Sequence, residues 1–191
     1  MLRIMIFDER SDRSLYLRLM LERLGYEVVA EVGDARRLHD EVTRLSPDAI
    51  IIDTKSPSRD TLEHVCLISD RCPRPIVMFT QDADNILIRE AVRVGVTAYV
   101  VDGLAPDRVK PIIETALARF EAFQQVKHEL DVTRTQLSER KLIERAKGIL
   151  MREKNLSEEA AYRMLRKFAM NKNTTLAKVS EQVVSVASLL T

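Results

Sequence analysis

The sequence has little glycine, cysteine and histidine and lacks tryptophan. It contains five glycines and two cysteines among 191 residues. Cys66 and Cys72 have no metal-ligand neighbours, so we expect both to be reduced and structural. No apolar run approaches the roughly 18–20 residues that span a bilayer, and the apolar start "MLRIMIFDE" is too short for a signal peptide. We therefore expect a cytoplasmic protein without a membrane partner.

The charge is unevenly distributed along the chain. Hydrophobic residues make up 46% and charged residues 31%, as in a folded globular protein, and the formal net charge is only +1. Residues 138–191 nevertheless hold 11 basic and 6 acidic residues, whereas the rest holds 19 basic and 23 acidic ones. A basic C-terminal region is typical of a segment that meets a polyanion, and also of a solvated helical face.

Up to about residue 110, short β-branched runs alternate with helical periods. The expected strands are 3–7, 27–32, 49–53, 75–80 and 98–101. Five strands with helical crossovers predict an α/β domain with a doubly wound parallel sheet. In the first helix, Leu15, Leu19 and Leu24 mark the expected inward face, and Gly25 is a natural C-cap.

After Pro106 the strand signals stop and the pattern becomes all-α. We expect one long helix over 107–153, with Pro111 in its first turn. Phe123, Leu130 and Leu137 repeat at seven residues, with Val126 offset by three. This spacing fits a homodimeric coiled coil and equally a helix that packs on its own chain.

Two shorter helices follow the long one. Ser157 is a good N-cap for the second, and the third begins near Thr175 with Leu176, Val179, Val183 and Val186 inward. The predicted domains are 1–110, a helical linker 111–137, and a three-helix module 138–191.

Acidic residues gather where the expected strands end. Asp8 and Glu9 follow the first strand, Asp53 the third and Asp102 the fifth, while Thr80 ends the fourth. The carboxyl ends of parallel strands share one edge of a sheet, so these side chains should converge. Converging carboxylates need a cation, which predicts a Mg²⁺ site at Asp8, Glu9 and Asp53. A metal-bound aspartate can also attack a phosphoryl group.

These residues resemble the receiver domain of bacterial two-component response regulators over roughly residues 1–120. "IMIFDE" resembles its first strand, and "IIIDTKSP" its phosphoacceptor strand with Asp53. "IVMFT" and "GVTAYVV" are similar to the strands that carry the switch residues, here Thr80 and Tyr99. The resemblance implies a flavodoxin-like sheet with strand order 2-1-3-4-5.

One position departs from that family. The lysine that contacts the phosphoryl group in receiver domains is replaced here by Asp102, followed by Gly103. An anion there repels a phosphoaspartate. Lys55 is near in sequence. The domain is expected either to switch by phosphorylation or to act as a docking module.

Basic residues crowd the end of the long helix and the helix after it. Arg140, Lys147 and Lys154 can line one stripe suited to phosphate contacts. Gly148 lies in a helix interior, where glycine costs up to about 1 kcal/mol relative to alanine. Either a second helix packs against it, or its backbone is open to a ligand while Tyr162 stacks on an exposed base.

"LSERKLIERAKGILM" followed by "EEAAYRMLRKFAM" resembles the ANTAR domain, the RNA-binding module of transcription antiterminators. Within that family the chain is similar to NasT-type regulators of nitrate and nitrite assimilation. The resemblance implies binding to two hairpins of a leader mRNA, with RNA polymerase affected only indirectly and a nitrate-sensing protein as inhibitory partner. It implies a role in RNA binding for the following residues: Arg140, Lys141, Ala146, Lys147, Gly148, Met151, Tyr162 and Arg166.

Two other classes of function fit the sequence less well. A DNA-binding response regulator needs a recognition helix rich in base-reading side chains, but the last helix offers only Lys178 and Gln182. An enzyme on the flavodoxin-like fold needs a phosphate-cradling glycine-rich loop or a Cys/His pair, and neither is present. The sequence therefore favours an RNA-binding regulator over an enzyme.

Overall fold

The computed structural model describes residues 1–8, 14–102 and 104–189. The chain divides into two compact units, Met1–Gln124 and Gln125–Thr191, which are described separately below. The predicted boundaries at 110 and 137 stay a prediction. Glu9 and Gly103 lie outside the described residues.

The first unit is built on a parallel sheet with the order β2-β1-β3-β4-β5. This confirms the predicted flavodoxin-like topology. Its strands are β1 Arg3–Asp8, β2 Glu27–Val32, β3 Ala49–Asp53, β4 Ile76–Thr80 and β5 Ala98–Val101. The three central strands are almost wholly buried because parallel strands are covered on both faces.

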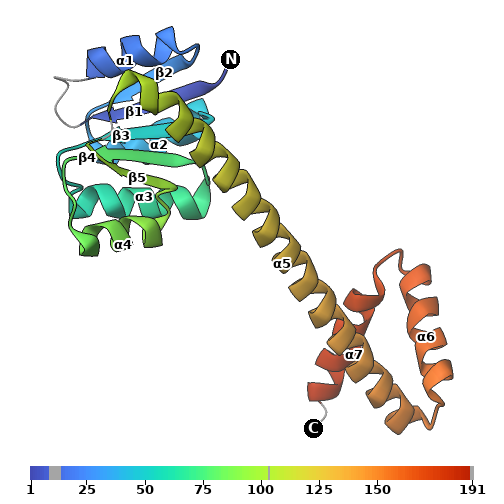
Figure 1. Ribbon diagram of the computed structural model, residues 1–191. Coiled ribbons are helices and arrows are strands. Elements are labelled where there is room, and N and C mark those ends of the chain that lie inside the picture. The colour runs from blue at the N-terminus through green and yellow to red at the C-terminus, as the bar shows by residue number, and fades with distance from the viewer. Residues whose placement is uncertain (9–13, 103, 190–191) are drawn as a thin grey trace. The chain divides into compact units, whose positions relative to one another are not determined.

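Alternation along the strands makes two cores, one on each face of the sheet. Ile4 and Ile6 pack with α1 (Ser14–Arg23) and the start of α5 (Pro106–Lys154). Met5 and Phe7 point the other way. They pack under α2 (Ala35–Leu45), α3 (Arg59–Arg71) and α4 (Asn85–Val94). Figure 1 shows α3 and α4 on the opposite side of the sheet from α1.

The inward face predicted for α1 was wrong for Leu15 and Leu19, whereas Leu24, just after the helix, packs partly buried against the core. Leu15 and Leu19 are 64% and 49% exposed, whereas Leu17 and Leu21 are fully buried. The helix is apolar on two sides, and period alone does not say which side meets the sheet. Its predicted end is confirmed: Gly25 has φ +89° and its N–H donates to the carbonyl of Glu22 at 3.1 Å.

Helix α5 runs unbroken from Pro106 to Lys154, so it belongs to both units. Pro106 itself occupies the first helical position, and Pro111 falls one turn further in than predicted. In its middle, Phe123, Leu130 and Leu137 are 64%, 47% and 54% exposed. None of the helices that the structure describes combines the length and the apolar character needed to span a membrane.

The second unit is a small three-helix module formed by the end of α5, α6 (Glu158–Asn171) and α7 (Leu176–Leu189). The predicted N-cap Ser157 is confirmed, since its side chain accepts a hydrogen bond from the Ala160 N–H at 3.3 Å. Alanines dominate the core and let the helices approach closely. The buried residues are Ala146, Leu150, Ala161, Leu165, Ala169 and Val179.

Candidate functional sites

The first candidate site is an acidic cavity at the carboxyl ends of the strands. Asp8 and Asp53 are register partners on β1 and β3, and they are only 7% and 5% exposed. Asp53 also lines a cavity of about 250 Å³ together with Thr80 and Asp102. The structure thus brings together Asp8, Asp53, Thr80 and Asp102 at one edge of the sheet, as the strand ends predict.

The residues at this edge fit a divalent cation in their chemistry. Two buried carboxylates side by side are costly unless a positive charge compensates them, and carboxylate oxygens are ligands that Mg²⁺ prefers. Among the described residues no group of three acidic, His or Cys side chains is close enough to hold a metal. Glu9, the third predicted ligand, lies outside the described residues.

Asp102 occupies the place where a phosphoryl-binding cation would be needed. It lines the same cavity as Asp53, and its backbone has a positive φ of 50°. Lys55 is exposed and does not line the cavity. Instead, the Lys55 carbonyl accepts hydrogen bonds from the Thr80 hydroxyl at 2.8 Å and the Gln81 N–H at 3.1 Å. The cavity therefore contains no cation among its described lining residues.

The predicted switch residues Thr80 and Tyr99 belong to one hydrogen-bond network. The Thr80 hydroxyl accepts from the Asp82 N–H at 3.1 Å, and the Tyr99 hydroxyl donates to the Asp82 carbonyl at 3.0 Å. Burial is the largest cause that raises the pKa of Tyr99, and the carboxylates of Asp82 and Asp84 add to it. Tyr99 thus stays a neutral donor that ties β5 to the loop after β4.

The second candidate site lies on the three-helix module. Six of the eight predicted RNA-binding residues are exposed: Arg140, Lys141, Gly148, Met151, Tyr162 and Arg166. The other two, Ala146 and Lys147, are 0% and 7% exposed. Their side chains face the module, so they cannot contact RNA in this structure. The predicted stripe of Arg140, Lys147 and Lys154 is wrong for the same reason.

Lys147 holds α5 against the start of α6. Its ammonium lies 2.9 Å from the Glu144 carboxylate and 2.7 Å from that of Glu158. The hydrogen bonds to Glu144 and then Glu158 raise the pKa of Lys147, and Lys147 lowers the pKa of Glu158. Counting charges along the sequence could not predict this ion pair, because Lys147 and Glu158 are 11 residues apart.

Gly148 is exposed, and a Cβ added there would meet nothing within 4 Å. This finding excludes the reading in which a second helix of the module packs closely against it. One helical turn from Gly148 lie the exposed side chains of Glu144, Arg145, Met151 and Arg152, and Lys141 lies two turns away. Arg145 and Arg152 were missing from the predicted RNA-binding set, although their spacing from Gly148 would have indicated them.

Helix α6 adds an aromatic and a cation to the exposed surface. Tyr162 is 42% exposed, and Arg166 lies one turn later on the same side of the helix. Exposed aromatic rings stack on unpaired bases, and guanidinium groups bind phosphates bidentately. Taken together, the exposed candidate residues of the two helices α5 and α6 are named the Gly148 surface: Lys141, Arg145, Gly148, Met151, Arg152, Tyr162 and Arg166.

Comparison with known proteins gives each unit a family. Residues 4–114 match the response regulator receiver domain, and residues 131–184 match the ANTAR domain. The receiver-domain structure of a modulated diguanylate cyclase from Desulfovibrio desulfuricans G20 is 24% identical. It covers 63% of this chain and 96% of that chain with a TM-score of 0.56. At that identity it supports the fold alone.

Two named relatives cover different shares of the chain. The transcriptional regulatory protein PdtaR of Mycobacterium tuberculosis (strain ATCC 25618 / H37Rv) is 31% identical over 182 residues, which are 95% of this chain and 89% of the relative. The nitrate regulatory protein of Klebsiella oxytoca is 33% identical over 88 residues, only 46% of this chain and 22% of that protein. The chain therefore belongs to the response regulators that join a receiver domain to an ANTAR domain, a family of regulatory proteins and not of enzymes.

Proposed function

We propose that this protein is a transcription antiterminator that binds paired hairpins in a leader mRNA and thereby prevents a terminator from forming. The observation that carries the proposal is the Gly148 surface, in which a glycine with open space lies among cations on an ANTAR domain. A helix gives up stability for such a glycine, which is expected where a ligand approaches the backbone closely.

Each part of the Gly148 surface has a separate task in this proposal. The backbone at Gly148 lets a flat base come close to α5, and Tyr162 on α6 offers a ring for stacking. Lys141, Arg145 and Arg152 supply phosphate contacts, which give affinity that weakens with salt but carry no sequence information. Specificity then rests on the unpaired bases of a hairpin loop.

Two hairpins require two binding surfaces, which two copies of the chain would supply. The seam formed by Phe123, Val126, Leu130 and Leu137 supports this, because all four side chains are at least 47% exposed and repeat with coiled-coil spacing. We therefore propose a homodimer through α5. In sedimentation velocity, Leu130→Glu should then give monomers, whereas Val132→Glu, an exposed valine off the seam, should not. Equal sedimentation of both variants and the parent would contradict the dimer.

For control of the activity, we propose a protein partner in preference to phosphorylation. The support is Asp102, whose carboxylate lines the cavity beside Asp53 and would repel a phosphoryl group there. If Mg²⁺ binds, the carboxylates of Asp8, Asp53 and Glu9 would hold it, because carboxylate oxygens are ligands that this ion prefers. The proposed partner is an inhibitory sensor that sequesters the RNA-binding module.

Nitrate and nitrite assimilation is the process we propose for this regulator. The support is the resemblance to NasT-type regulators and the 46% of the chain that matches the nitrate regulatory protein. This assignment can fail while the proposal of RNA binding holds. Tighter binding of the protein to a nitrate-assimilation leader RNA than to an unrelated two-hairpin leader RNA would support it, and equal affinity for both would contradict it.

The direct test is a binding titration of the full chain at one fixed salt concentration. It compares a two-hairpin leader RNA with a DNA duplex of equal length and charge. The proposal predicts much tighter binding to the RNA, because loop bases are offered only there. Equal, salt-sensitive binding to both would reveal a generic basic face, and tighter binding to DNA would favour a DNA-binding regulator.

A further inference from the structure

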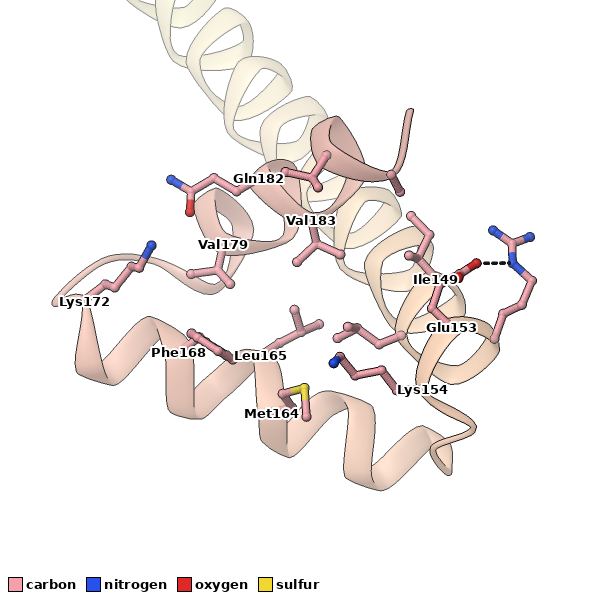
Figure 2. A pocket seen from close by; sticks show the side chains of 14 residues that line it. Ile149, Glu153, Lys154, Met164, Leu165, Phe168, Lys172, Val179, Gln182 and Val183 are labelled. Carbon is pink, nitrogen blue, oxygen red and sulfur yellow. Dashed lines mark hydrogen bonds and ion pairs between the residues drawn. The ribbon is translucent and has the colours of Figure 1, made fainter. Parts of the chain in front are cut away.

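The three-helix module contains a second feature that RNA binding does not use. An open pocket of about 530 Å³ lies between the end of α5, α6 and α7, as Figure 2 shows. This volume is typical of sites for small organic molecules. The pocket walls are mostly apolar, formed by Ile149, Leu150, Met164, Leu165, Phe168, Val179, Val183, Val186 and Ala187.

The rim of this pocket carries an excess of positive charge. Of its charged residues, Arg152 and Glu153 pair with each other at 3.3 Å. Neither Lys154 nor Lys172 has a carboxylate within 4 Å in the part of the chain that the structure describes. Figure 2 shows the Lys154 ammonium pointing into the pocket toward Met164, while the amide of Gln182 points away from it. An ammonium over an apolar floor favours an anion that carries an apolar body.

We propose that this pocket binds a small amphipathic anion. The apolar body fills the space between the three helices, and a carboxylate or another anionic head group pairs with Lys154 and Lys172. A nucleotide fits less well, because no described group inside the pocket offers to read a base. A neutral apolar compound would leave the two ammonium groups uncompensated.

Arg152 belongs to both the pocket rim and the Gly148 surface, but the other pocket residues lie outside that surface. Met164 and Phe168, which line the pocket, share one side of α6, whereas Tyr162 and Arg166 share another. Residues two apart on a helix are rotated by about 200°, so these sides face different ways. A ligand that touches α5, α6 and α7 together stabilises the folded module by mass action. The inference therefore stands whether or not the module binds RNA.

A tryptophan placed in the pocket gives a direct test, because the chain has none of its own. Val186→Trp puts the reporter on the pocket wall, and Met170→Trp puts it on α6 at a 72% exposed position that does not line the pocket. Each full-length variant is titrated with monomeric octanoate, decanoate and dodecanoate, and with decanol. Only Val186→Trp should respond to the carboxylates, with affinity rising about fourfold per added methylene.

Charge variants without the tryptophan complete the test. Their binding of decanoate is measured by calorimetry. Lys154→Gln and Lys172→Gln should each weaken binding on the order of tenfold. Lys178→Gln, an equal charge change on α7 outside the pocket, should not. Decanol binding as tightly as decanoate would overturn the proposal, and so would equal losses in all three variants. Absence of any binding to the parent protein at millimolar decanoate would overturn it as well.

Discussion

The two units of this chain present their chemistry in opposite ways. In the receiver unit, topology forces buried carboxylates together in a cavity, and whole strands such as β3 are buried around it. In the ANTAR unit, a small alanine-rich core leaves the candidate chemistry on the outside of α5 and α6. Strand order thus positions the first site, while helical phase positions the second. The second site is therefore harder to read from sequence.

The largest expected effect comes from weakening the smaller core. Leu165 is 1% exposed at the centre of the ANTAR unit. Leu165→Ala should cost that unit about 2–5 kcal/mol, a large part of the stability of a small domain. Circular dichroism should then show the ANTAR unit melting first, with the receiver unit unchanged. Met170→Ala, on an exposed position of the same helix, should change stability by about 0.5 kcal/mol or less. One shared transition in Leu165→Ala would show that the units unfold together.

Arg166→Glu should break RNA binding without disturbing the fold. Arg166 is exposed on the Gly148 surface, so its reversal removes a phosphate contact and adds repulsion. We expect affinity for the leader RNA to fall by tenfold or more and the salt dependence to become shallower. Lys178→Glu makes the same charge change on α7 and should cost much less. Equal losses would mean that only net charge matters.

Lys147 should behave as a structural residue, in contrast to Arg166. Because Lys147 lowers the pKa of Glu158, their pairing stabilises the folded state at pH values above 4.5, the ordinary pKa of a glutamate. That contribution is lost as the pH falls through the lower pKa of Glu158 in the folded state. In urea unfolding, Glu158→Gln should therefore be less stable than the parent at pH 7, and this difference should shrink at pH 3. A difference independent of pH would contradict the assigned ion pair.

The smallest expected effect is that of Asp53→Asn on RNA binding. Because Asp102 lines the cavity where a phosphoryl group would sit, we expect phosphorylation of Asp53 to have no role in RNA binding by the ANTAR unit. We expect the affinity for leader RNA to stay within about twofold of the parent, a free-energy change below about 0.5 kcal/mol. Tenfold weaker binding in the same titration would show that the acidic cavity controls RNA binding after all.

Much of the receiver unit could be predicted from sequence because its signals are local. Three successive isoleucines mark β3, and the order of the strands alone brings Asp8, Asp53 and Thr80 to one edge. The inward face of α1 could not be predicted in the same way. Leu15 and Leu17 are equally apolar, and only contact with the sheet decides between them.

In the ANTAR unit, residue type was a poor guide to position. Lys147 is charged and yet buried, because two glutamates compensate its ammonium. Gly148 could be read either as a packing residue or as a contact residue until the space around it was known. The apolar pocket depends on how the helices around Leu165 fit together, which no single segment encodes.

The central claim is that the open backbone at Gly148 serves RNA and not packing, and Gly148→Ala tests it most directly. The added methyl meets nothing within the protein, so the helix should gain about 0.5–1 kcal/mol and the ANTAR unit should melt later. The same methyl should hinder close approach of a base, so we predict that affinity for the leader RNA falls about tenfold. A more stable variant that binds RNA as tightly as the parent would contradict the account.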